Sequence, residues 1–77
     1  MAPSIFITGA ASGIGRAAAL RFSAEGWLTG LYDIDPLGLA ETRRQLPTDR
    51  HITGALDVTD PDAWTRAVAD FAAVTDG

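Results

Sequence analysis

Apolar residues along the chain alternate between two kinds of spacing, which predict strands and helices in turn. A short apolar run from Ser4 to Thr8 has the length of a buried strand. From Ile14 to Phe22, apolar residues recur four positions apart, as they do on one face of a helix. Gly26 follows this stretch and suits a left-handed cap at the end of the helix.

The same alternation continues through the middle of the chain. Residues 27–32 are almost entirely apolar and predict a second strand, in which Gly30 is a weak point. Asp35 and Pro36 then predict the cap and the first turn of a second helix, because proline has no amide hydrogen to leave unpaired there. Gly38 weakens this helix, and the Leu46-Pro47 pair ends it.

A third strand and a third helix complete the pattern. The third strand is predicted to begin at His51, with one face formed by Ile52, Leu56 and Val58. Asp60-Pro61 repeats the capping signal, and the helix after it has an apolar stripe at 3.6-residue spacing: Trp64, Ala67, Val68, Phe71 and Val74. Strands that alternate with helices of this length imply parallel strands joined by right-handed crossovers. Residues 1–77 are therefore predicted to form one α/β unit.

Composition narrows the classes of protein that fit this pattern. The chain has 77 residues, 47% of them hydrophobic, no cysteine and a net charge of −4. Its six basic residues are scattered arginines, which argues against a nucleic-acid or membrane-binding surface. No signal peptide or membrane span is visible, so we expect a soluble cytoplasmic protein. His51 has no cluster of partners in the sequence, and no metal site is expected.

Three glycines, Gly9, Gly13 and Gly15, lie between the first strand and the first helix. Main-chain amides at such a junction point toward the positive end of a helix dipole and can bind a phosphate. Gly9 would allow the tight turn, Gly13 would let a pyrophosphate approach the main chain, and Gly15 would let the helix pack close to the strand. A plain strand-to-helix turn is the alternative interpretation. A mononucleotide P-loop is excluded, because the chain has no lysine.

Residues 8–15, T-G-A-A-S-G-I-G, resemble the T-G-x-x-x-G-I-G signature of the short-chain dehydrogenase/reductase family. The acidic end of the second strand and the D-V-T segment at residues 57–59 are also similar to that family. The resemblance implies a three-layer, doubly wound parallel sheet (Rossmann-like), of which this chain is the first βαβαβα half of a domain of about 250 residues. It also implies that a dinucleotide lies against the loop residues Gly9, Ala11, Ser12, Gly13, Ile14 and Gly15.

The position of Asp33 favours NAD over NADP. A carboxylate at the end of the second strand of a dinucleotide fold accepts hydrogen bonds from the adenosine ribose and repels a 2′-phosphate. Ser12 and Ile34 stand where family members that use NADP often carry a basic residue. By resemblance, Asp57 would contact the adenine amino group, and Val58 and Ile34 would flank the ring. The alternatives are a capping role for Asp33 and a place in the core for Val58.

The resemblance also indicates what this chain lacks. The family's reaction uses a tyrosine, a lysine four residues later, and a serine, but Tyr32 is the only tyrosine and Pro36 follows it at that spacing. We therefore expect Tyr32 to be structural, no catalytic residue in residues 1–77, and no turnover by this chain alone. Arg16 lies on the predicted helix near the pyrophosphate and is expected to be solvated.

The sequence thus predicts the cofactor-binding half of an NAD-dependent oxidoreductase that acts on an alcohol/carbonyl pair. A non-catalytic NAD-sensing or binding module of the same fold is the alternative, and a methyltransferase is disfavoured by the residues of the loop. Members of the family are often homo-oligomers. The doubly wound order would leave the strand of residues 4–8 at an edge, which suggests that residues 1–77 are a fragment of a longer protein.

Overall fold

A computed structural model describes residues 3–76 of the chain. Strands and helices alternate as the sequence predicts. Their bounds are β1 (Ser4–Thr8), α1 (Gly13–Ala24), β2 (Leu28–Asp33), α2 (Pro36–Gln45), β3 (His51–Ala55) and α3 (Pro61–Asp76). Both predicted aspartate caps are confirmed, because Asp35 accepts hydrogen bonds from the Leu37 and Gly38 amides and Asp60 from the Asp62 and Ala63 amides.

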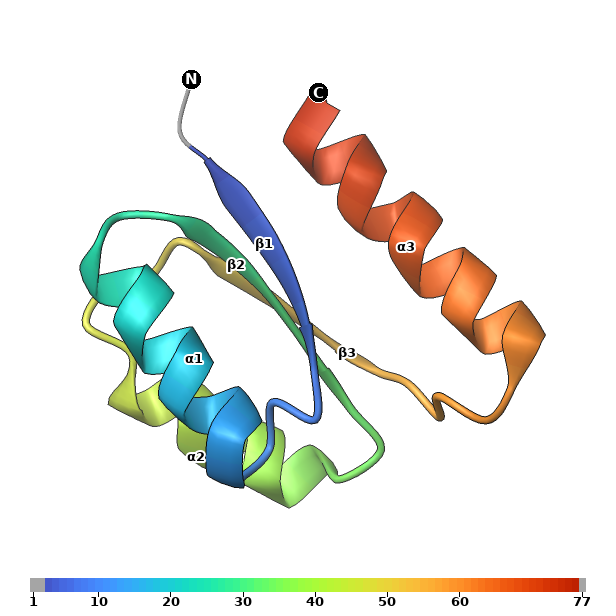
Figure 1. Cartoon of the computed structure of the whole chain (residues 1–77), viewed down its shortest axis with the longest axis horizontal. Coiled ribbons are helices and arrows are strands. Elements are labelled where there is room, and N and C mark those ends of the chain that lie inside the picture. Colours follow the sequence, from blue (N-terminus) through green and yellow to red (C-terminus); the bar gives the residue numbers. More distant parts are fainter. Residues whose placement is uncertain (1–2, 77) are drawn as a thin grey trace.

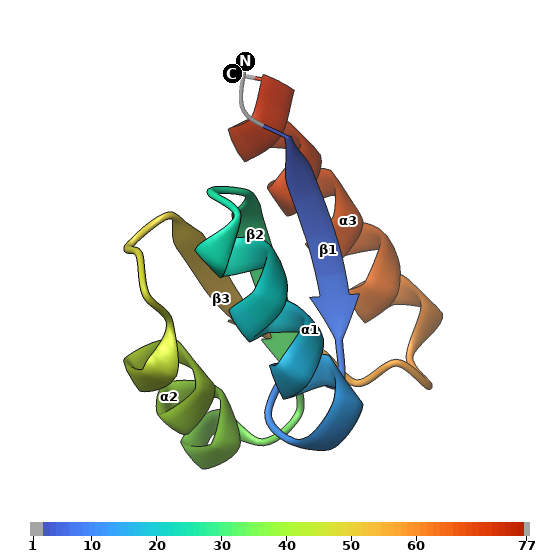
Figure 2. The same ribbon diagram turned by 60° about the vertical axis from the view of Figure 1, so that its left-hand side comes forward.

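The strands form one parallel sheet with β2 in the centre, in the order β1-β2-β3. Helices α1 and α2 lie side by side on one face of the sheet, and α3 lies on the opposite face (Figures 1 and 2). This is a partial Rossmann-like α/β fold of three layers, and β1 and β3 are its outer strands. Within residues 3–76, no helix has both the length and the apolar character needed to cross a bilayer.

The third strand is shorter than the sequence predicts. It ends at Ala55, opposite Asp33, where the neighbouring strand β2 also ends. One more main-chain bond joins the Leu56 amide to the Asp33 carbonyl at 3.1 Å, and the chain then turns away. Leu56 is buried, whereas the side chain of Val58 is 59% exposed. The prediction that Leu56 and Val58 belong to β3 is therefore wrong, because no partner strand extends beyond Asp33.

Glycines in β2 and β3 make room for aromatic rings on the face of the sheet that α3 covers. A Cβ atom at Gly30 would lie 2.6 Å from Cε1 of Phe71, and one at Gly54 would lie 2.6 Å from Cε1 of Tyr32. The Tyr32 ring in turn stacks on Phe6, with ring centroids 4.5 Å apart. Gly30 is a weak point in the strand pattern of the sequence. Its lack of a side chain is what allows the aromatic rings to pack under α3.

The apolar stripe of α3 is only partly in this core. Ala67 and Phe71 are buried, but Trp64, Val68 and Val74 are exposed. The core on the other face of the sheet is built from smaller residues, with Ile7 and Leu31 of the sheet packed against Ala19 and Leu39 of the helices. Helix α1 contributes the small side chains of Ala18 and Ala19 to this core, whereas α2 contributes the larger side chain of Leu39.

The phenol of Tyr32 is expected to make the fold sensitive to alkali. Burial, and to a smaller extent the negative charge of Asp70, raise the pKa of Tyr32 above its ordinary value of 10.0. The unfolded chain therefore loses this proton first, so the stability linked to Tyr32 is intact below about pH 10 and is lost as the pH rises through the pKa of the folded state. Tyr32→Phe keeps the ring stack and removes the titration.

Urea unfolding at intervals between about pH 9 and 11 measures this effect. The parent should lose stability more steeply with pH than Tyr32→Phe does. In the folded parent, tyrosinate absorbance should appear at a higher pH than in the unfolded chain. Parallel loss of stability in the two proteins would contradict the assignment.

Candidate functional site

The carboxyl ends of the three parallel strands meet at one edge of the sheet, the lower edge in Figures 1 and 2. The loops that leave this edge are residues 9–12, residues 34–35 and residues 56–60. All the residues that the sequence singles out for cofactor binding lie in these loops, in the first turn of α1 or at the end of β2. The topology therefore brings together residues that are far apart in the sequence.

The glycine loop has the conformation that its sequence suggests. Gly9 and Gly13 have φ angles of +68° and +59°, a region that side chains with a Cβ atom rarely adopt. A Cβ atom at Gly15 would lie 2.1 Å from the carbonyl oxygen of Gly9, so α1 packs directly on the main chain that leaves β1. Nothing lies within 4 Å of a Cβ built on Gly13, which faces open space.

The amino end of α1 has free donors. Ser12 is the N-cap residue, with extended main chain (φ −164°, ψ 172°), but its side chain makes no capping hydrogen bond. The first amides of a helix have no partner within the helix, and those of the first turn of α1 have no side-chain acceptor among residues 3–76. Ile14 in this turn is 90% exposed. Uncapped amides at the positive end of a helix can bind an anion.

Ala10 and Ala11, in contrast, are fixed inside the protein. The Ala10 amide donates to the Tyr32 carbonyl at 3.3 Å, and the Ala10 carbonyl accepts from the hydroxyl of Thr42 at 2.7 Å. The Ala11 amide donates to Asp33, and the Ala11 carbonyl accepts from Arg16. The main chain of Ala11 therefore offers no free donor to a ligand, although the sequence places this residue in the cofactor loop.

The prediction that Arg16 is solvated is wrong. Its Nε atom donates to Thr42 at 2.8 Å, and its Nη2 atom donates to the carbonyl oxygens of Ala11 and, at 3.3 Å, of Gly38. Thr42 is fully buried on α2 and lies 26 residues from Arg16 in the sequence. Sequence reasoning missed Thr42, because only the packing of α2 beside α1 brings these two residues together.

Asp33 lies at the end of β2, and both of its oxygens already accept one hydrogen bond. Its Oδ2 atom accepts from the Ala11 amide at 3.0 Å, and its Oδ1 atom from the Asp35 amide at 3.1 Å. A carboxylate has about four lone-pair positions, so about two remain. The capping of α2 is carried out by Asp35 and not by Asp33. Asp33 is therefore free to accept two hydroxyl groups while it holds the glycine loop.

The third loop places Asp57 and Val58 beside this edge. The Oδ1 atom of Asp57 accepts from the Thr59 hydroxyl at 2.6 Å and from the Thr59 amide at 2.9 Å, and these bonds lower the pKa of the Asp57 carboxyl. Asp57 is thus an ionised acceptor at neutral pH, which suits a contact with an amino group. Val58 and Ile34 are 59% and 67% exposed. Val58 is therefore not a core residue within residues 3–76.

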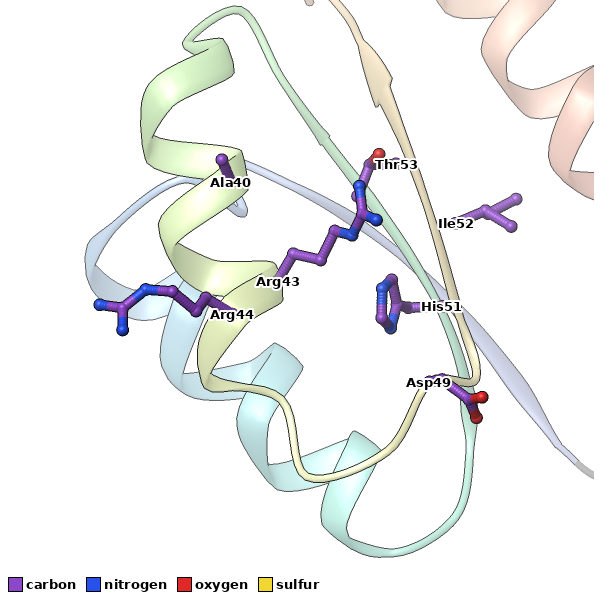
Figure 3. A pocket seen from close by; sticks show the side chains of 7 residues that line it. All are labelled: Ala40, Arg43, Arg44, Asp49, His51, Ile52 and Thr53. Carbon is purple, nitrogen blue, oxygen red and sulfur yellow. The ribbon is translucent and has the colours of Figure 1, made fainter.

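Two hollows lie between α2 and β3. One, of about 800 Å³, is lined by Arg43, Arg44 and His51 among others, and the side chain of Arg43 reaches from α2 toward Thr53 of β3 (Figure 3). None of the predicted cofactor residues lines it. A smaller hollow nearby includes Asp33 and Pro36 in its wall. Within residues 3–76, no three side chains suited to a metal ion lie together.

A parallel three-layer α/β unit with an open glycine loop and a carboxylate at the end of β2 defines the class of this chain as Rossmann-like. The model of one family, described as short chain dehydrogenase, matches residues 3–76. The chain belongs to this family.

Two relatives and one solved structure illustrate the similarity. The chain is 47% identical over 72 residues to a sulfoacetaldehyde reductase from Chromohalobacter salexigens, and the matched region covers 90% of this chain and 28% of that protein. It is 40% identical over 67 residues to a 2-dehydro-3-deoxy-L-rhamnonate dehydrogenase (NAD(+)) from a Sphingomonas species, and this matched region covers 87% of this chain and 26% of that protein. A crystal structure of a short chain dehydrogenase from Mycobacterium paratuberculosis bound to NAD is 33% identical, with a TM-score of 0.85, and covers 94% of this chain and 32% of that one. The chain thus spans between a quarter and a third of the length of these proteins.

Proposed function

We propose that residues 1–77 are the cofactor-binding part of a longer NAD-dependent oxidoreductase that transfers hydride between nicotinamide and an alcohol or carbonyl substrate. The observation that carries the proposal is that two features lie at the same edge of the sheet. One is the uncapped amino end of α1, and the other is the carboxylate of Asp33, which holds the loop in front of that helix. The amides suit a pyrophosphate, and the lone pairs left on Asp33 suit the two ribose hydroxyls. The residues present therefore fit a dinucleotide.

The charge of Asp33 supports NAD as the cofactor. A 2′-phosphate at the ribose would bring a second anion next to the carboxylate, and no basic side chain stands at Ser12 or Ile34 to compensate for it. The names of a relative and of a solved structure, which both include NAD, favour the same cofactor. In this proposal Ile34 and Val58 flank the adenine ring, and Asp57 accepts from its amino group.

The rest of the active site would come from residues beyond this chain. Hydride transfer to a carbonyl needs a group that moves the hydroxyl proton, and Tyr32, the only tyrosine, is buried under α3. Within residues 3–76, strand β1 pairs with β2 alone, and its apolar sequence favours a further strand on the other side. A longer protein would supply that strand and the catalytic residues.

Gly13→Val tests the phosphate role of the loop. A Cβ atom at Gly13 meets no protein atom, so packing is not disturbed, and the cost to the fold is that of the positive φ angle of +59°, which a β-branched residue rarely adopts. The branched side chain would occupy the space in front of the first-turn amides and should lower the affinity for NAD by about 100-fold or more, a cost of about 3 kcal/mol. Titration calorimetry measures the affinity, and far-ultraviolet circular dichroism should show unchanged helix content. Unchanged affinity would contradict the proposal.

A further inference from the structure

We infer that Thr42 and Arg16 are positioning residues of the dinucleotide site, which fix one half of the glycine loop so that the other half stays open to pyrophosphate. The inference rests on the proposed function. Neither side chain would touch the cofactor, and both act through the main chain of Ala10 and Ala11.

The hydrogen bonds of the loop divide it into two halves. All four main-chain polar groups of Ala10 and Ala11 have partners inside the protein, and both residues are almost completely buried. Ser12 and Gly13 come next and are exposed, and Ser12 makes no side-chain cap. The position of the free amides is therefore set by the fixed pair that precedes them.

Thr42 and Arg16 hold this fixed pair from two helices. The Thr42 hydroxyl donates to the Ala10 carbonyl and accepts from Nε of Arg16, so a single buried oxygen joins the loop, α1 and α2. The planar guanidinium of Arg16 extends the connection to the carbonyls of Ala11 and Gly38. A lysine could not make these bonds, because its single ammonium group cannot donate from two separate nitrogen atoms, as Nε and Nη2 of Arg16 do.

The connection also sets the distance between the two parts of the site. Gly38 lies in the first turns of α2, which is capped by Asp35, and the Asp35 amide donates to Asp33. Arg16 therefore joins the pyrophosphate loop to the segment that carries the ribose carboxylate. A binding site needs its groups held to within about 0.5 Å. When the loop is released from Thr42, the affinity of the protein for the dinucleotide should therefore fall even though the protein stays folded.

Two fully buried threonines provide a matched pair of variants. Thr42→Val leaves the Ala10 carbonyl and Arg16 Nε without a partner, whereas the hydroxyl of Thr29 has no hydrogen-bond partner to lose. The titrations use the protein with its whole natural reading frame, and the probes are NAD and adenosine, which lacks phosphate. Thr42→Val should weaken NAD binding about tenfold and change adenosine binding by less than about twofold, and Thr29→Val should leave both unchanged.

Two more variants keep the test decisive if Thr42→Val folds poorly. Thr42→Ser retains the hydroxyl and should restore the affinity for NAD, and Arg16→Lys, at a partly exposed site, should reproduce the selective loss. Equal NAD affinity in the parent and in both Thr42→Val and Arg16→Lys would overturn the inference, as would an equal loss for NAD and adenosine. A parent that does not bind NAD at all would instead overturn the proposed function.

Discussion

Gly15→Ala is expected to destabilise the fold by about 3 kcal/mol or more, because its Cβ atom would make the closest approach of those built on the glycines that the structure describes. The added Cβ atom would lie 2.1 Å from the carbonyl oxygen and 2.5 Å from the carbonyl carbon of Gly9, and 3.0 Å from the Ala10 amide nitrogen. All three are main-chain atoms, so no side-chain rotation relieves the clash. The first turn of α1 must move away from the end of β1. Urea unfolding followed by circular dichroism measures the loss.

Gly13→Ala is the matched control, two residues away in the same loop. Its Cβ atom would meet nothing within 4 Å, and the only cost is the positive φ angle of +59°. That cost is about 1–2 kcal/mol for a residue with a Cβ atom. The difference between the two variants therefore measures the close packing of α1 on β1. Equal losses would contradict the assignment, because Gly15 has no positive φ angle and only its close approach to Gly9 and Ala10 requires glycine there.

Local patterns in the sequence were enough to predict the order of elements and their parallel arrangement. Hydrophobic spacing placed β1 and the start of α1 at the residues where the structure has them, and the Asp-Pro pairs located the caps of α2 and α3. These features depend on interactions within a few residues, so one stretch of sequence carries the information. The predicted end of the third strand is wrong because it depends on a contact between elements: β3 ends where its partner β2 ends.

The parts of the site that depend on contacts between elements were not visible in the sequence. Asp33 was singled out for a ribose, and its bond to the Ala11 amide joins residues 22 positions apart. The sequence predicts a solvated Arg16, because nothing near this residue in the sequence indicates Thr42 as a partner. Gly38 weakens the helical pattern of α2 in the sequence, yet a Cβ atom there would lie 2.6 Å from the Cβ of Ala11, so the glycine allows α2 to approach the loop. The cofactor assignments themselves stay predictions.

Asp33→Ala is expected to change both the affinity for the cofactor and the choice between NAD and NADP. Removal of the carboxylate takes away the acceptor for the ribose hydroxyls and the charge that repels a 2′-phosphate. At a separation of about 4 Å near a protein surface, such repulsion is worth about 2 kcal/mol after screening, so the preference for NAD should narrow by about 30-fold. Titration calorimetry of both dinucleotides against parent and variant measures this change.

The bond between Asp33 and the Ala11 amide adds a second consequence, which separates charge from geometry. Asp33→Ala leaves that amide without its partner, so binding of NAD and NADP should both weaken in addition to the change in preference. Asp33→Asn keeps an oxygen that can accept from Ala11 but removes the charge. It should narrow the preference as Asp33→Ala does and retain more of the affinity for NAD. A parent that binds NAD and NADP equally, or an Asp33→Asn variant that still prefers NAD by the parent's margin, would remove Asp33 from the cofactor site and leave it only the role of shaping the loop.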